Sequence, residues 1–330
     1  MTRQCRWGIM ATGGIADKFV SDLMTAGLPV AAAGSRSGSK AQAFAEAHGI
    51  PAAHGSYAAL VGDPNVDVVY VATPHPFHLE GARLALEAGK HVLIEKPLAM
   101  NAREARELVT LAEAKGLFLM EAMWTRFLPH MVRLREILAE GTLGQIRSLR
   151  ADHSQALPED PGHRLNDKAL GGGALLDLGI YPVSFAWDVL GAPEEVHAVG
   201  RFKETGADAG VEIVMRHDGG ALSQMSCASD FAGPNTAQIV GEKAIVEIDA
   251  VWYTPSRLRV LSHDGAVLEE FDTRPEGRGM ECQALAVQEA VLGGRTSDPR
   301  MTPAQTVHIM ETMDRIRAEI GLRYEADAAG

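Results

Sequence analysis

Apolar positions in the first third of the chain alternate between two spacings. Short runs of β-branched and small apolar residues, typical of buried strands, occur at 6–10, 30–34, 66–72, 91–95 and 118–123. Between them, segments with the apolar spacing of helices occur at 15–26, 39–48, 78–88 and 102–115. This alternation predicts a parallel sheet with helices on both faces, which binds its ligands at the carboxyl ends of the strands.

The pattern changes near Gln145. From there, predicted strands follow one another without intervening helices, at 194–202, 211–217, 221–228, 237–240, 244–248 and 258–261. The turn pairs Asp218-Gly219 and Asp264-Gly265 favour hairpins. Such a series predicts a mostly antiparallel sheet with one face packed on helices. The helices of this part are predicted at 174–190, 279–292 and 303–320.

Composition narrows the choice of partners. The formal net charge of −12 and the absence of a long Lys/Arg run argue against a nucleic-acid partner. No stretch approaches roughly 18 unbroken apolar residues, and the first residues lack the apolar run of a signal peptide, so no membrane association is expected. Cys5, Cys227 and Cys282 form no C-x-x-C pair, which favours a reducing, cytoplasmic location over a zinc site or disulfide framework.

A glycine-rich turn follows the first predicted strand and precedes the first predicted helix. Backbone N–H groups and the positive dipole end of a helix can hold a pyrophosphate there, and Gly13 occupies the position where a side chain would block its approach. Ala11 must make the turn without glycine's freedom at positive φ. The turn alone is as compatible with a structural as with a binding role. Its position favours binding, with candidate residues Thr12, Gly13, Gly14 and Ile15.

The end of the second predicted strand indicates which dinucleotide binds. An acidic residue there would hold the ribose hydroxyls of NAD, but no carboxylate occurs before Glu46. Ser35, Arg36 and Lys40 instead offer a hydroxyl, a guanidinium and an ammonium group to a 2′-phosphate. The pattern therefore favours NADP over NAD, the alternative being an ordinary solvated helix start.

Three further strings carry a resemblance to a known family. They are Thr73-Pro-His-Pro-Phe-His78, Glu95-Lys96-Pro97 and the segment from Gly171 to Tyr181. With the glycine turn they resemble the family named after glucose–fructose oxidoreductase and inositol dehydrogenase, over nearly the whole chain. The segments 121–127 and 171–181 are similar to the branch of that family that contains dimeric dihydrodiol dehydrogenase.

The resemblance implies roles for individual residues. Lys96 would lie next to the nicotinamide, and Tyr181 would donate and accept the substrate proton. The remaining residues implied or inferred to bind the cofactor are Thr73, Pro74, His75, His78, Glu95, Trp124, Arg126 and Arg164. Relatives cover the outer face of the large sheet with a second subunit, so a homodimer or higher homo-oligomer is expected.

Residue chemistry supports the same site. A phenol with a pKa near 10 is a poor base at neutral pH, and a nearby ammonium such as Lys96 lowers the pKa of Tyr181. If residues 174–190 are largely helical, Asp177 lies one turn before Tyr181 on the same face and can accept a hydrogen bond from a substrate hydroxyl. Pro182 weakens this helical reading.

The sequence also allows other interpretations. His75 and His78 could suggest a metal pair, but no Cys or acidic cluster accompanies them, so no metal is predicted. The leading function is an NADP-dependent oxidoreductase acting on an aldose or a cyclic trans-diol. The alternatives are an enzyme acting at another ring position of a sugar or nucleotide-sugar, and a non-catalytic NADP-binding sensor. The loop at 155–167 would set substrate preference.

The predicted fold has two domains. A doubly wound α/β domain of Rossmann type, which binds the dinucleotide, is placed at residues 1–124. An α+β domain with a large, mostly antiparallel open sheet, for substrate binding and oligomerisation, is placed at 125–330. The last helix can return to the first domain.

Overall fold

The computed structural model describes residues 3–328 and contains two compact units, each with its own sheet. The first comprises Met1–Phe127 and Glu276–Val307, and the second comprises Leu128–Pro275 and His308–Gly330. The first unit is therefore discontinuous in sequence. The boundary expected after residue 124 stays a prediction.

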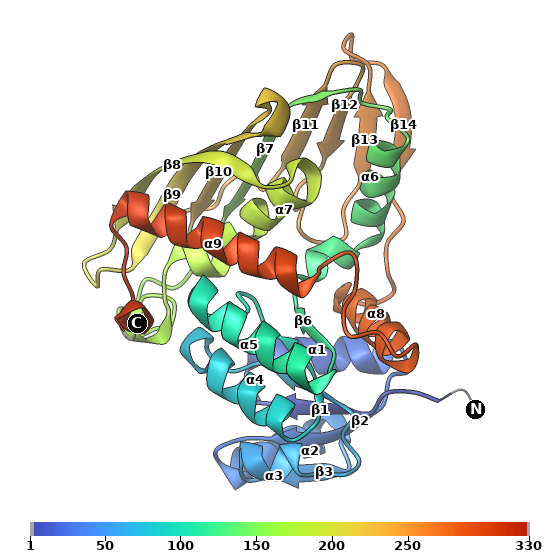
Figure 1. Cartoon of the computed structure of the whole chain (residues 1–330), viewed down its shortest axis with the longest axis vertical. Coiled ribbons are helices and arrows are strands. Elements are labelled where there is room, and N and C mark those ends of the chain that lie inside the picture. Colours follow the sequence, from blue (N-terminus) through green and yellow to red (C-terminus); the bar gives the residue numbers. More distant parts are fainter. Residues whose placement is uncertain (1–2, 329–330) are drawn as a thin grey trace. The chain divides into compact units, whose positions relative to one another are not determined.

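The first unit contains a six-stranded, wholly parallel sheet in the order β3-β2-β1-β4-β5-β6 (Figure 1), which confirms the predicted doubly wound architecture. The strands are β1 (Trp7–Met10), β2 (Val30–Gly34), β3 (Ala52–His54), β4 (Val68–Val71), β5 (His91–Ile94) and β6 (Leu119–Glu121). The sequence pattern missed β3, because three half-buried residues are too few to show a period.

Helices cover this sheet. They are α1 (Gly14–Thr25), α2 (Gly38–His48), α3 (Tyr57–Val61), α4 (His78–Glu87), α5 (Ala102–Lys115) and α8 (Met280–Leu292), with short turns η1 (His75–Phe77) and η2 (Trp124–Phe127). The pairs α4 with α5 and α1 with α8 lie side by side (Figure 1). Phe19 of α1 stacks on Tyr70 of β4 with ring centroids 3.9 Å apart, which fixes the first helix on the sheet.

The second unit contains an eight-stranded sheet in the order β14-β13-β12-β11-β7-β10-β9-β8. Its strands are β7 (Ile146–Ser154), β8 (Pro193–Phe202), β9 (Asp208–His217), β10 (Leu222–Ala228), β11 (Ala237–Gly241), β12 (Ile245–Ile248), β13 (Leu258–Leu261) and β14 (Val267–Phe271). All neighbouring pairs are antiparallel except β7 with β10, so the mostly antiparallel sheet is confirmed.

Two of these strands were not predicted from the sequence. The central strand β7 places Leu149, Ala151 and His153 in the buried layer, and only the first of these is a large apolar residue. The edge strand β14 is largely exposed and carries two glutamates. Neither strand has the apolar alternation that marks a half-buried strand, since one is buried through small or polar residues and the other is barely buried.

Helices pack on one face of the second sheet. They are α6 (Pro129–Ala139), α7 (Ile180–Leu190) and the part of α9 (Pro303–Ile320) from His308 onward, and the short turns are η3 (Lys168–Leu170), η5 (Asp218–Gly220) and η6 (Glu325–Asp327). Trp187 of α7 donates its indole N–H to Thr312 of α9 at 3.0 Å. Ile320 of α9 packs directly on Gly200 of β8, where any side chain would meet it.

The predicted helix over 174–190 exists, but its beginning differs from a regular α-helix. Leu175–Gly179, labelled η4, is a π-helical turn that continues into α7. Pro182 has no N–H to donate to the preceding turn, and the wider π turn lies directly before it. Asp177 therefore lies on a π turn and Tyr181 about one turn later at the start of α7, instead of both lying on a regular α-helix.

One segment, Lys168–Leu190, is long and apolar enough to span a membrane by composition, with a hydropathy of 1.3. Within its most apolar window, 89% of the residues are buried inside the structure. Such burial is typical of a core helix, so length and composition give only weak support for a membrane span.

Candidate active site

Strand register in the first sheet brings the predicted cofactor loops to one edge. Met10, the last residue of β1, pairs with the last residues of both neighbours, Gly34 of β2 and Val71 of β4. Val71 in turn pairs with Ile94, the last residue of β5. The glycine turn, the Ser35 loop, the Thr73 loop and Glu95-Lys96 therefore all leave the sheet at the same level, which is where doubly wound sheets bind ligands.

The glycine turn has the geometry of an anion-binding helix start. Ala11 adopts a φ of +78°, so it does make the left-handed turn without being glycine. Gly13 is the N-cap of α1 and no side chain caps the helix there. A Cβ added to Gly13 or Gly14 would have no protein atom within 4 Å. The turn therefore leaves open space in front of backbone N–H groups, which suits a pyrophosphate.

The end of β2 presents cations. Ser35 is buried, and Arg36 and Lys40 are exposed on the following loop and the first turn of α2. The Arg36 guanidinium lies 5.6 Å from the centre of the Phe77 ring. Burial raises the pKa of Tyr57, and the charge and hydrogen bond of Arg36 oppose this rise. Arg36 thus interacts with both Phe77 and Tyr57 and is still exposed to solvent.

His78 ties together the two loops beside the predicted nicotinamide site. Its side chain is fully buried, with Nδ1 2.7 Å from the carbonyl oxygen of Pro97 and Nε2 2.8 Å from that of Thr73. The ring of His75 packs against it edge-on at 5.6 Å. The two histidines therefore fix the positions of Thr73 and of the segment that carries Lys96. The described residues contain no group of three His, Cys, Asp or Glu side chains placed to hold a metal ion.

Sequence reasoning did not single out Glu121, at the end of β6. Burial raises the pKa of this carboxyl to about 7, and the charge of Glu95 adds to the rise. The N–H of Leu98, which donates to Glu121 at 2.9 Å, and the charges of Arg126 and Lys96 lower the pKa. Glu121 therefore belongs to the electrostatic surroundings of Lys96. A carboxylate at the end of a buried strand was the signal available in the sequence.

The segment after β6 is anchored inside the first unit. Arg126 is buried and donates to the carbonyl oxygen of Arg300 at 3.0 Å and to the Gln305 side chain at 2.5 Å. Trp124 is also buried, and the Arg278 guanidinium lies over its ring, 5.7 Å from the ring centre. Both residues hold η2 in place, and their predicted cofactor contacts stay predictions.

The second unit groups the remaining predicted residues. Asp177 lies on the π turn and Tyr181 at the start of α7, both largely buried. The Tyr181 ring packs edge-on against His153 of β7 at 4.8 Å and tilted against Tyr253 at 5.5 Å. Arg164 reaches within 3.8 Å of Asp177. The structure thus collects a phenol, a carboxylate and a guanidinium at one end of α7.

His153 and Tyr253 were not identified from the sequence. Their rings stack at 3.6 Å, and the Gln155 amide lies 2.7 Å from His153 Nε2 and donates to the Tyr253 hydroxyl at 3.1 Å. These residues lie on a strand that the pattern missed and on the loop after β12, so spacing along the chain could not relate them to Tyr181.

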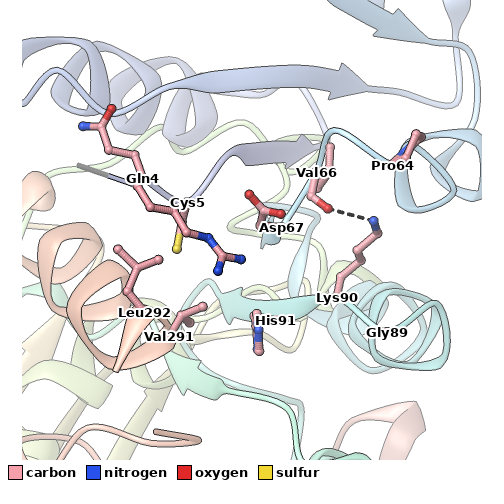
Figure 2. Close-up of a pocket in the computed structure, with 11 residues that line it drawn as sticks. Gln4, Cys5, Pro64, Val66, Asp67, Gly89, Lys90, His91, Val291 and Leu292 are labelled. Carbon is pink, nitrogen blue, oxygen red and sulfur yellow. Dashed lines mark hydrogen bonds between the residues drawn. The ribbon is translucent and has the colours of Figure 1, made fainter. Parts of the chain in front are cut away.

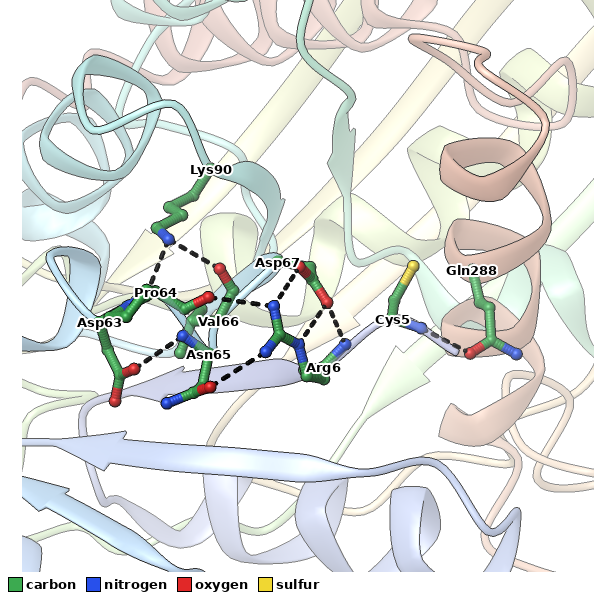
Figure 3. Close-up of polar contacts among 9 residues, drawn as sticks. All are labelled: Cys5, Arg6, Asp63, Pro64, Asn65, Val66, Asp67, Lys90 and Gln288. Carbon is green, nitrogen blue, oxygen red and sulfur yellow. Dashed lines mark hydrogen bonds and ion pairs between the residues drawn. The ribbon is translucent and has the colours of Figure 1, made fainter. Parts of the chain in front are cut away.

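A hollow of about 300 Å³ lies elsewhere in the first unit, at the amino ends of β1, β4 and β5 (Figure 2). Its polar groups are largely used within the protein: Lys90 donates to the carbonyl oxygens of Asp63 and Val66 at 2.8 and 2.7 Å, and Arg6 pairs with Asp67 (Figure 3). It lies at the edge opposite the predicted cofactor loops, and these contacts give it a structural role.

Comparison with known proteins identifies both units of the fold. Residues 5–123 match the oxidoreductase family with an NAD-binding Rossmann fold, and residues 131–247 match the GFO/IDH/MocA C-terminal domain. The chain is 39% identical over 331 residues to trans-1,2-dihydrobenzene-1,2-diol dehydrogenase of Mus musculus and 38% identical over 337 residues to that of Homo sapiens. Each match covers 98% of this chain and 98% of the relative.

Solved structures resemble this fold closely. A 3-ketoreductase from Actinomadura kijaniata, in complex with NADP and TDP-benzene, is 28% identical with a TM-score of 0.86, covering 96% of this chain and 98% of its own. An aldose-aldose oxidoreductase from Caulobacter crescentus, complexed with glycerol, is 26% identical with a TM-score of 0.86, covering 96% and 97%.

The open glycine turn generates a prediction. Gly13→Ala adds a Cβ that meets no protein atom, so the thermal unfolding midpoint should change little, whereas dinucleotide affinity, measured by fluorescence titration, should fall about tenfold or more as the pyrophosphate is displaced. Gly34→Ala is the matched control, because its Cβ would lie 2.8 Å from Leu60 and should lower the midpoint. Undiminished affinity in Gly13→Ala would contradict the assignment of this turn.

Proposed function

The chain belongs to the GFO/IDH/MocA oxidoreductase family. We propose that it is an NADP-dependent enzyme with Tyr181 as its acid/base group. At the coarser level it is a dehydrogenase or reductase of CH–OH groups, related to enzymes of sugars and diols. The finer proposal is hydride transfer at a hydroxyl-bearing carbon of an aldose or cyclic trans-diol, with Lys96 assisting Tyr181.

The observation that carries the cofactor proposal is the cationic end of β2. A 2′-phosphate there would meet the Arg36 guanidinium, the Lys40 ammonium and the Ser35 hydroxyl, and Arg36 is already positioned by the Phe77 ring. Between Ser35 and Glu46 there is no carboxylate that would repel the phosphate. The related 3-ketoreductase was solved with NADP, which agrees with this choice.

The residues present fit a nicotinamide dinucleotide, because the open turn at Gly13 can take its pyrophosphate and the in-register strand ends can take the rest. When bound, this cofactor supplies the hydride acceptor or donor. In oxidation, the Tyr181 phenolate oxygen would take the proton of the substrate hydroxyl, and in reduction it would return that proton. The Lys96 ammonium would favour the phenolate and donate a hydrogen bond to the substrate oxygen.

Side chains around Tyr181 support a hydroxyl-rich substrate. Asp177 can accept a hydrogen bond from a second hydroxyl, and Arg164 lies near it. His153 and Tyr253 stack on each other and pack against the Tyr181 ring, which holds the phenol in place. A sugar and a cyclic diol both present neighbouring hydroxyls, so the pair of Tyr181 and Asp177 suits either.

A second candidate within the same class is reduction or oxidation at another ring position of a sugar, including a nucleotide-linked one. The fold of the 3-ketoreductase, which was solved with TDP-benzene, favours this candidate. A non-catalytic sensor is disfavoured, because both the lysine and the tyrosine that the chemistry needs are in the sequence.

The activity is tested directly. Purified protein with NADP and a panel of pentoses, hexoses and trans-diols should produce reduced nicotinamide absorbance, and NADPH with keto-sugars should consume it. Tyr181→Phe should lower kcat roughly 10²- to 10⁴-fold through loss of the proton carrier, and Lys96→Met should abolish turnover while NADP binding persists. Lys115→Met, an exposed lysine at the end of α5, is the control and should match the wild type.

If no substrate of either panel changed the reduced-nicotinamide absorbance, the proposed reaction would be contradicted. Unchanged turnover in Lys96→Met would exclude Lys96 from the mechanism. The sensor would instead show tight NADP binding without turnover and a protein partner in pull-downs.

Cofactor preference has its own test. Arg36→Gln removes a charge-assisted contact of about 1.5–3 kcal/mol, so the KM for NADP should rise about 10- to 100-fold while the KM for NAD stays the same. Arg295→Gln, an exposed arginine paired with Glu289, is the control. Equal effects of Arg36→Gln on NADP and NAD would place the 2′-phosphate elsewhere.

We also propose that the outer face of the eight-stranded sheet is covered by a second copy, in a cytoplasmic homodimer or higher homo-oligomer. Val199, Val214 and Leu222 are large apolar residues that remain exposed on β8, β9 and β10. The three cysteines are free thiols, as suits a reducing compartment. Sedimentation at micromolar concentration should give a mass of at least two chains, and a monomer would contradict the proposal.

A further inference from the structure

The start of the helical segment that carries Asp177 and Tyr181 is held by a carboxylate distant in sequence. Asp208, the first residue of β9, is fully buried. Its Oδ2 accepts the backbone N–H of Leu175 at 2.6 Å. Leu175 is the first residue of the π turn, where backbone N–H groups have no partner within the helix.

Two glycines allow close backbone packing before this helix start. Gly173 has a φ of +138°, and a Cβ there would lie 2.0 Å from Asp208 Oδ1. At Gly172 a Cβ would lie 2.7 Å from the carbonyl oxygens of Arg164 and Asp167. Tyr324, near the carboxyl end of the chain, donates its hydroxyl to the Gly172 carbonyl at 3.0 Å. Gly173 thus lets the backbone approach the carboxylate, and the hydrogen bond from Tyr324 holds the neighbouring residue, Gly172, in place.

A charged side chain is not needed to fill the space that Asp208 occupies. Burial raises the pKa of this carboxyl to about 6, against the N–H groups of Leu175, Asp208 and Ala174 and the charge of Lys203, which lower it. A neutral side chain of the same size would avoid the desolvation of a charge. What the carboxylate provides instead is a strong, charge-assisted hydrogen bond to a helix start, where negative charge is favoured.

We propose that Asp208 is a positioning residue for the reaction: by holding the N–H of Leu175 it fixes Asp177 on the π turn and, one turn later, Tyr181. This inference rests on the function proposed for Tyr181. Acid/base catalysis needs the proton-carrying atom within hydrogen-bond reach of the substrate oxygen, and a shift of about 1 Å can lower the rate by roughly 10². Asp208 acts on this segment through its backbone, by accepting the N–H of Leu175.

The titratable groups around Asp208 come from three elements. Lys203 follows β8, Cys227 lies on β10 and Tyr324 belongs to the carboxyl-terminal segment. Burial, with the charge of Asp208 adding to it, raises the pKa of both Cys227 and Tyr324 well above their usual values, so both stay neutral between pH 5 and 8. Of the three buried groups Asp208, Cys227 and Tyr324, Asp208 is the one whose pKa, about 6, lies in that range.

The test compares Asp208→Asn and Asp208→Ala with the wild type in the full-length protein. Amide hydrogen exchange of the peptide covering residues 174–181, measured by mass spectrometry without substrate, should be faster in both variants and fastest in Asp208→Ala. Tyr324→Phe, which removes the second fastening, should accelerate exchange in the same peptide.

Steady-state kinetics distinguish a positioning role from a purely structural one, because only a positioning role changes the pH dependence of kcat. At pH 8, Asp208→Asn should lower kcat about tenfold, while the NADP dissociation constant stays unchanged. In the wild type kcat should fall as the pH drops through about 6. In Asp208→Asn, which resembles the protonated acid at every pH, that part of the profile should be absent.

Asp22→Asn is the matched control, because Asp22 is a buried carboxylate that accepts the N–H groups of Arg278 and Met280 at the start of α8, a helix without proposed catalytic residues. It should speed exchange near residue 280 and leave the pH profile of kcat unchanged. Unaltered exchange at 174–181 in Asp208→Asn and Asp208→Ala, or an unaltered kcat and pH profile in Asp208→Asn, would overturn the inference. If the wild type turns over no substrate, the proposed function fails, and exchange alone decides whether Asp208 holds the segment.

Discussion

The parallel register of the first sheet is the constraint on which the cofactor site depends. Met10, Gly34, Val71 and Ile94 end their strands at one level, and every loop that the proposal assigns to the dinucleotide starts from that level. A shift of one residue in any pairing would move a loop by about 3.3 Å and turn its side chains to the opposite face. The exposed cations and the open glycine turn can serve one proposed dinucleotide site only because this register holds.

The second unit holds two polar side chains inside an apolar core of sheet and helices. The segment Lys168–Leu190 is mostly buried, yet it carries Asp177 and Tyr181. The first turn of a helix has N–H groups without partners in this core, and Asp208 supplies an acceptor from the neighbouring sheet. Asp177 lies on the π turn that this contact holds, and Tyr181 follows at the start of α7.

Local charges matter more than the overall charge of the chain. The overall charge of −12 gives an anionic cofactor no general attraction, so the proposed binding would rely on local groups such as Arg36, Lys40 and the start of α1. Two buried carboxyls have raised pKa values, about 7 at Glu121 and about 6 at Asp208, because burial disfavours their charged forms. Each of them accepts a backbone N–H, and so each links a titratable group to the position of a loop or helix.

The sequence by itself determined the alternation of strands and helices in the first unit, the glycine turn and the cations after β2, because each of these is a local pattern of a few neighbouring residues. It also carried the family resemblance, through strings such as Glu95-Lys96-Pro97. Tertiary structure decided what lies around those residues. His153, Tyr253 and Asp208 are related to Tyr181 or its helix by contacts across sheet and helix, and β7 is a central strand despite its weak apolar pattern. Contacts between residues far apart in the chain leave no periodic signal, so only the folded molecule reveals them.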